Sequence, residues 1–207
     1  MMKRFHFLAA LLGVFVMFAV VTPSPVEAQF SSSYEFLKAV KERDGDKVKT
    51  LLEKSASTLV NTRDLAKGET ALHIVVARRD VAWTRFLLAK GANPNARDKN
   101  NVTPLLLAAR YRDVDIAEVL LRRKANVNGS NSSGETPLII AVQLSDLPMV
   151  RLLLKKGADP DQTDNIAGKS ARDYAMESRQ ATALLEVIDA EGKDTKKEDV
   201  QIFGPTL

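Results

Sequence analysis

The side chains that could do acid–base, nucleophilic or metal chemistry are few in this 207-residue chain. The chain has no cysteine and two histidines, and only His73 lies outside the first 28 residues. A multi-histidine metal site needs several imidazoles, which a single histidine cannot supply, and a catalytic triad would require a nucleophile and a carboxylate to converge on His73. We therefore predict no catalytic, metal-binding or cofactor-binding residues.

Two short motifs resemble a ligand-binding or a catalytic motif. Gly168-Lys169-Ser170 is similar to the end of a phosphate-binding loop, but Thr163 stands where such a loop needs glycine and no buried strand precedes it. Asp113 and Asp115 form a tempting carboxylate pair, but they fall in a turn between two predicted helices, where aspartate is favoured as a cap. We interpret both motifs as structural.

The elements that hold these residues are repeated units, because apolar and capping residues recur with a period of 33 residues. In each unit a threonine can cap a first short helix, and a second helix follows. Two helices of this length bury too little apolar surface to offset their ordering entropy, so each unit must stack on its neighbours. The positions that recur in register are Thr70, Thr103 and Thr136; Leu87-Leu88, Leu120-Leu121 and Leu153-Leu154; and Asp80, Asp113 and Asp146.

This period resembles that of the ankyrin repeat. The resemblance is carried by Thr-Ala-Leu-His at 70–73, Thr-Pro-Leu at 103–105 and 136–138, and Gly-Ala-Asn or Gly-Ala-Asp at 91–93 and 157–159. It covers residues 34–190 and implies an all-α solenoid of about five helix-turn-helix repeats with hairpin loops. The expected repeats lie near 34–66, 67–97, 98–130, 131–164 and 165–190, with polar caps at both ends.

Three departures from the family's pattern are local, and the first is Ala71, which replaces the usual proline. Lys124 stands where Gly91 stands in the preceding copy, so a residue with a side chain is expected in a left-handed conformation, at a cost of roughly 1–2 kcal/mol. Leu106 and Ile139 stand where the family has histidine. In the family this histidine hydrogen-bonds the backbone of a neighbouring repeat, and the resemblance implies the same role for His73.

Residues 1–28 are predicted to be a secretory signal peptide. Lys3-Arg4 precedes an apolar run from Phe7 to Val21, and Val26 and Ala28 place small residues where a signal peptidase cleaves. The run counts 15 residues, short of the roughly 20 that a membrane-spanning helix needs. An uncleaved membrane anchor is the alternative.

The two ends of the mature chain are predicted to be polar and flexible. Residues 29–33 form a short leader, and residues 191–207 form a tail rich in glycine and charged residues. Val200, Ile202 and Phe203 interrupt this polarity. This apolar cluster either folds back on the last repeat or forms a short partner-binding motif.

The charge balance is modest, with 30 Lys+Arg against 26 Asp+Glu. Removal of the signal peptide takes away Lys3, Arg4 and Glu27, which leaves 28 minus 25, or +3. Proteins that bind nucleic acid normally show a basic stripe with stacking aromatics, so no nucleic-acid partner is expected. An exported chain without cysteine suits the bacterial periplasm, and secretion is the alternative. We expect a monomer with no membrane contact after cleavage.

A basic group of side chains, with one aromatic and one aliphatic member, is the candidate partner-binding surface. In ankyrin stacks, first-helix ends and loop tips of this kind approach the concave binding face. Arginine beside an aromatic residue is typical of interface hot spots, and the partner would present an acidic surface. A plain solvated face is the alternative. The members are Arg78, Arg97, Lys99, Arg110, Tyr111 and Leu144.

Two other basic clusters have a structural explanation. Arg122-Arg123-Lys124 and Lys155-Lys156 lie at the predicted carboxyl ends of second helices. The helix dipole favours cations there, so we expect these clusters to be solvated and stabilising.

The resemblance implies a non-enzymatic protein–protein interaction module that binds a protein partner through its concave groove. Similar exported bacterial proteins are thought to support a periplasmic enzyme, with an antioxidant catalase as one family example. Two alternatives stay open at this point. One is a secreted effector that acts on a host protein, and the other is a ligand-binding or enzymatic protein with an unrecognised pocket.

Overall fold

The computed structural model describes residues 25–198, and residues 1–24 and 199–207 lie outside the described part. Within the described part the chain is all-α, as predicted, and its β pairing is limited to two isolated bridges. The helices are α1 (Pro25–Glu42), α2 (Gly45–Leu59), α3 (Ala71–Ala77), α4 (Val81–Ala89), α5 (Pro104–Arg110), α6 (Val114–Arg122), α7 (Pro137–Gln143), α8 (Leu147–Lys155), α9 (Ala171–Glu177) and α10 (Ala181–Glu198).

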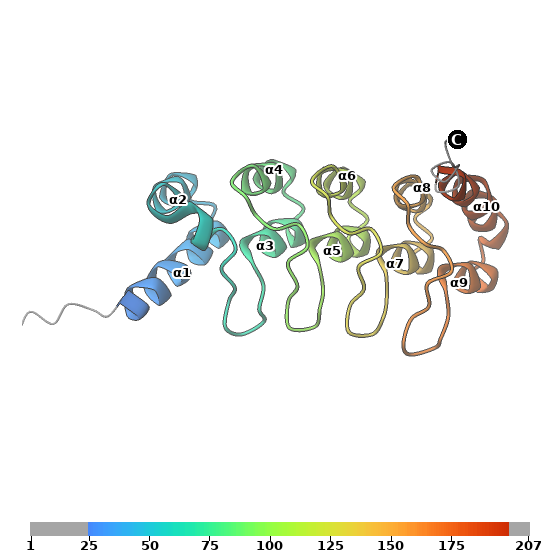
Figure 1. The fold of residues 1–207 in the computed structure, drawn as a ribbon, viewed down its shortest axis with the longest axis horizontal. Coiled ribbons are helices and arrows are strands. Elements are labelled where there is room, and N and C mark those ends of the chain that lie inside the picture. The colour runs from blue at the N-terminus through green and yellow to red at the C-terminus, as the bar shows by residue number, and fades with distance from the viewer. Residues whose placement is uncertain (1–24, 199–207) are drawn as a thin grey trace, which may run out of the picture.

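These ten helices form five consecutive pairs that stack in one row. The first helices of the inner pairs, α3, α5 and α7, pack side by side, and α4, α6 and α8 form a second layer (Figure 1). Loops project from the side of the first helices, away from the second layer. The solenoid of about five repeats is therefore confirmed.

The start of each inner helix is set by a capping residue. The Thr103 hydroxyl accepts a hydrogen bond from the backbone N–H of Leu106 at 3.3 Å, and Thr136 does the same for α7. Asp113 caps α6 by accepting from the N–H of Ile116 at 3.0 Å, and Asp80 and Asp146 cap α4 and α8 in the same way. These caps satisfy N–H groups that have no partner within the helix. The structural interpretation of Asp113 is confirmed.

The second helices end in left-handed residues. Gly91 and Gly157 have φ of 90° and 84°, and Lys124 at the equivalent position has φ of 63°. A side chain in this conformation is disfavoured, so Lys124 is strained as predicted. The basic clusters also lie where expected, because Arg122 and Lys155 occupy the last turns of α6 and α8.

The core runs through the whole stack and is made by the recurring leucines. Leu87, Leu120 and Leu153 are each completely buried. The same continuous cluster extends from Phe36 in α1 to Ile188 in α10. No repeat therefore has a core of its own, and stability comes from contact between neighbours.

Asparagine side chains link successive repeats along the loops. The amide of Asn95 donates to the carbonyl of Lys124 at 3.1 Å, and its oxygen accepts from the N–H of Asn126 at 2.7 Å. Asn61 and Asn128 make the same pair of bonds in their own repeats. The ladder ends at Asp161, whose carboxylate accepts from Arg172 instead.

The two predicted flexible segments are partly helical. Residues 29–33 lie within α1, which starts at Pro25 and meets no further proline or glycine before Glu42. Proline fits the first position of a helix, which explains this early start. Residues 191–198 continue α10, and the rest of the predicted tail lies outside the described residues, as does most of the predicted signal peptide. None of the described helices has the length and apolar character needed to cross a membrane.

Candidate partner-binding surface

The turns between first and second helices form a basic edge along the stack. Arg43, Arg79 and Arg112 occupy equivalent positions in successive turns, and their φ angles are 62°, 60° and 55°. Glycine is the residue that tolerates this left-handed conformation without cost, so each arginine is locally unfavourable. The recurrence of arginine at these positions is not explained by backbone preference.

Arg78 precedes this edge but serves the packing of the repeats. Its guanidinium donates to the carbonyl of Val40 in α1 at 2.6 Å and to Asp80 at 3.3 Å. It also lies over the ring of Trp83, with 5.1 Å between the guanidinium carbon and the ring centroid. The side chain is only 17% exposed. Arg78 therefore joins the first two repeats, so its guanidinium is engaged inside the stack and is not free to serve the predicted partner-binding surface.

Arg97 and Lys99 belong to the loops and also have internal partners. Arg97 donates to the carbonyl of Ser130 at 3.0 Å, and the Lys99 ammonium donates to the carbonyl of Leu65 at 2.7 Å. Both bonds connect one loop to the next. These residues precede α5, whereas Arg110 lies at its last position. The structure does not bring the six predicted residues into one cluster.

Arg110 and Tyr111 are exposed, as a partner-binding surface requires. Tyr111 is 41% exposed, and Arg110 is also exposed. Among the described residues, neither side chain makes a hydrogen bond or an ion pair. Leu144 differs, since its side chain is half-buried and packs against the core. Its carbonyl accepts a hydrogen bond from Arg112, so Leu144 supports the edge through its backbone.

The turn surface is defined here as Arg110 and Tyr111, from the predicted set, together with the neighbouring Arg79 and Arg112. Arg79 is 61% exposed on its side chain and donates to the Asp113 carboxylate at 3.3 Å, which places it beside Arg112. An exposed aromatic ring among three arginines offers a flat apolar contact surrounded by positive charge. Such a surface suits an acidic protein face.

His73 has a structural role. Its Nε2–H donates to the carbonyl of Val102 in the next repeat at 3.0 Å, and Nδ1 accepts from the N–H of Thr70 at 3.2 Å and lies 2.9 Å from the Thr70 hydroxyl. Burial lowers the pKa of this imidazole, which is 1% exposed. His73 is therefore neutral at physiological pH, and the expected bond to a neighbouring repeat is confirmed.

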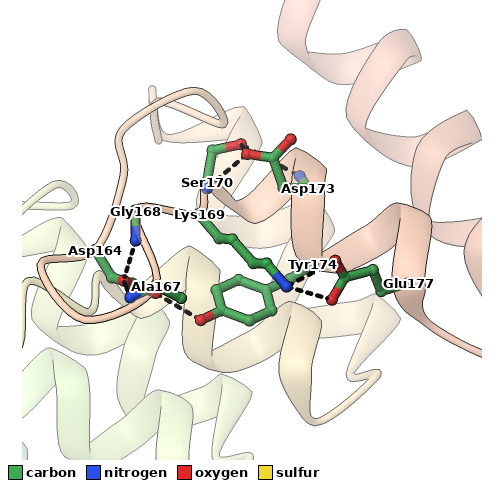
Figure 2. Close-up of polar contacts among 8 residues, drawn as sticks. All are labelled: Asp164, Ala167, Gly168, Lys169, Ser170, Asp173, Tyr174 and Glu177. Carbon is green, nitrogen blue, oxygen red and sulfur yellow. Dashed lines mark hydrogen bonds and ion pairs between the residues drawn. The ribbon is translucent and has the colours of Figure 1, made fainter.

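The last loop carries a dense polar network, which Figure 2 shows. The Asp164 carboxylate accepts from the N–H groups of Ala167 at 2.7 Å and Gly168 at 3.1 Å, and from the Tyr174 hydroxyl at 2.6 Å. The bond from Tyr174 lowers the pKa of Asp164, and the same bond raises the pKa of Tyr174. This carboxylate fixes the loop against α9.

The lysine and serine of the suspected phosphate-binding motif are engaged in the same network. Figure 2 shows the Lys169 ammonium directed at the Glu177 carboxylate, with N–O distances of 2.7 and 2.8 Å. Ser170 forms a reciprocal cap with Asp173 at the start of α9. These contacts support the structural interpretation of Gly168-Lys169-Ser170. No group of three or more potential ligands in residues 25–198 could hold a metal ion.

Comparison with known proteins agrees with this architecture. A family model described as ankyrin repeats, in three copies, matches residues 36–131, 84–164 and 125–199. The human 2-5A-dependent ribonuclease is 38% identical over 84 residues, which is 40% of this chain and 11% of the ribonuclease. Oxysterol-binding protein homolog 1 of Saccharomyces cerevisiae is 34% identical over 82 residues, 38% of this chain and 7% of that protein. The chain thus spans about a tenth or less of the length of these relatives.

Proposed function

Because the chain belongs to the ankyrin-repeat family, whose members act as protein–protein interaction modules, we propose that it binds an acidic protein partner through the turn surface. It acts in the bacterial periplasm, without catalysis of its own, and supports a periplasmic enzyme. The activities named for the matched relatives are not transferred, since only a small repeat segment of each relative is shared.

The observation that carries this proposal is the exposure of Arg110 and Tyr111. Four of the six predicted residues have a structural partner, whereas the side chains of these two make no hydrogen bond or ion pair within the part of the chain that the structure describes. Tyr supplies contact area at a low cost in conformational entropy, and Tyr and Arg dominate the energetics of many interfaces. Arg79 and Arg112 beside them add positive charge, which steers an acidic partner.

The proposed location rests on the amino-terminal residues. The basic pair, the apolar run and the small residues at Val26 and Ala28 support export and cleavage after Ala28. Intact-mass analysis of protein from a periplasmic fraction is expected to show a chain that starts at Gln29. Recovery of uncleaved chain in the membrane fraction would contradict export as a free protein, and recovery from culture medium would favour a secreted effector.

Partner capture tests the binding proposal. The purified chain, immobilised through its carboxyl terminus, is exposed to periplasmic extract, and the retained proteins are identified by mass spectrometry. Arg110→Glu with Tyr111→Ala is expected to abolish retention of the specific partner. The matched control is Arg122→Glu with Lys156→Glu, which alters exposed basic residues at second-helix ends. Retention lost only in the control would move the binding site to the outer helices.

A further inference from the structure

A second surface feature lies at the amino-terminal end of the stack, between α1 and the loop before α3. It is a hollow of about 470 Å³, called here the N-terminal hollow. Its lining includes Tyr34, Leu37 and Lys41 from α1, and Arg63, Leu65 and Ala66 from the loop. This volume falls within the roughly 300–1,000 Å³ range typical of sites that enclose a ligand.

The N-terminal hollow has unusually exposed apolar walls. Tyr34 is 68% exposed and Leu65 is 81% exposed. In the described part of the chain, five large hydrophobic residues are exposed, and two of them line this single hollow. Leu37 is buried and closes the floor on the α1 side. Apolar surface gathered around one concavity is a mark of a binding site, whereas scattered exposed residues are ordinary.

The loop that carries Leu65 is held in place before any ligand arrives. The Asp64 carboxylate accepts from the N–H groups of Lys67 at 2.8 Å and Glu69 at 3.2 Å. From the next repeat, Lys99 donates its ammonium to the carbonyl of Leu65 and its backbone N–H to the carbonyl of Lys67 at 2.9 Å. A fixed loop reduces the entropy lost on binding. The exposure of Leu65 is therefore built into a rigid tip.

The rim of the hollow is positively charged. Lys41 and Arg63 make no ion pair with any described residue, whereas Lys38 is paired with Glu42 at 3.9 Å. Asp64 is the acidic lining residue, and its Oδ1 accepts from backbone N–H groups. Burial acts to raise the pKa of Asp64, but these N–H groups hold it below its usual range. The charge of Lys41 also lowers this pKa, so the rim sets Lys41 and Arg63 against one carboxylate and stays net positive beside the apolar walls.

We propose that the N-terminal hollow binds a short acidic segment of a protein partner. One aromatic or branched aliphatic side chain of the segment inserts between Tyr34 and Leu65, and flanking carboxylates lie beside Lys41 and Arg63. This inference rests on the proposed function in that its ligand belongs to a protein. It uses residues separate from the turn surface, so the two sites can be tested independently.

Phage display provides the probe. A library of random 12-residue peptides is selected on the purified chain, and the enriched peptides are synthesised with a fluorescent label and titrated by fluorescence anisotropy. The expected consensus has one large apolar residue with Asp or Glu close to it. Enrichment of no peptide, or of peptides without acidic residues, would overturn the proposal.

Two variants and a matched control locate the binding. Leu65→Ser is expected to weaken the selected peptides by about ten-fold or more, as truncation of an interface anchor does. Lys41→Glu is expected to weaken them and to reduce the dependence of the affinity on salt. Ile166→Ser is the control, because Ile166 is a 79% exposed aliphatic residue in another loop and does not line the hollow.

Each pattern of results has one interpretation. Affinity that falls with Leu65→Ser and holds within about two-fold with Ile166→Ser, a change typical of a neutral contact, supports the proposal. Equal loss in both variants, or no loss with Leu65→Ser, overturns it. Peptides that are lost only with Arg110→Glu and Tyr111→Ala would support the turn surface and overturn the N-terminal hollow. Both exposed substitutions leave the core intact, so folding is expected to be preserved.

Discussion

The buried histidine makes the stability of the stack depend on pH in a way that can be calculated. Folded His73 is neutral, since Nε2–H donates to Val102 and Nδ1 must stay unprotonated to accept from Thr70. Burial lowers its pKa below the ordinary value of 6.5. As the pH falls below about 6.5, the unfolded chain binds a proton at this residue and the folded chain resists it. The stabilisation is fully present above pH 6.5 and is lost as the pH falls toward the folded-state pKa.

The size of the loss follows from the linkage relation. One pH unit below the unfolded pKa, the free energy of unfolding falls by at most about 1.4 kcal/mol if the folded imidazole stays neutral. His73→Leu provides the comparison, because Leu106 and Ile139 fill the equivalent positions and are completely buried. The variant loses the bonds to Val102 and Thr70, so its stability at neutral pH is expected to be lower. The pH dependence is the quantity that tests the assignment.

Urea unfolding followed by the fluorescence of Trp83 measures this dependence. Both proteins are unfolded at several values between pH 7.5 and pH 5.5. Carboxylates titrate in both chains, so the difference between them isolates His73. The wild type is expected to lose more stability than the variant as the pH falls, by at most about 1.4 kcal/mol at pH 5.5. Equal losses in both proteins would refute the assignment of a neutral, bonded imidazole.

Two further predictions concern the stack. Leu153→Ala is expected to lower the free energy of unfolding by roughly 2–5 kcal/mol, because Leu153 is completely buried between repeats. Urea unfolding measures this loss. A loss below about 1 kcal/mol, which is typical of surface substitutions, would contradict the assignment of Leu153 to the core. Lys124→Gly is expected to raise the melting temperature, because it relieves about 1 kcal/mol of strain in the left-handed backbone at this position. Calorimetry measures the change. A lower melting temperature would mean that the lysine side chain stabilises the helix end by more than the strain costs.

The sequence predicts the solenoid well because its signals are local and repeated. A threonine cap or a recurring leucine pair needs only its own helix and its neighbour in register, so Thr136 and Leu120 could be assigned from spacing alone. The helical start at Pro25 is not predicted from the sequence, because Ser31 to Ser33 are polar and weak helix formers. In the structure α1 runs through these serines and on past Phe36.

The candidate surface was predicted less well, for a physical reason. Arg78 and Lys99 bond to the backbone carbonyls of residues 38 and 34 positions away. Every residue has a backbone carbonyl, so the sequence does not indicate which residue accepts such a bond. Leu65 does carry a signal, since a leucine between Asp64 and Gly68 in a tight loop has no core to enter. The position of Leu65 is therefore the feature of the sequence that could have indicated the N-terminal hollow.

The affinity of the captured partner for turn-surface variants tests the central claim most directly. Surface plasmon resonance is expected to show that Tyr111→Ala speeds dissociation by about ten-fold or more and that Arg110→Glu slows association and reduces its dependence on salt. Circular dichroism is expected to be unchanged, since both side chains are exposed. Affinity that stays undiminished in both variants, while Arg122→Glu with Lys156→Glu loses it, would contradict binding through the turn surface.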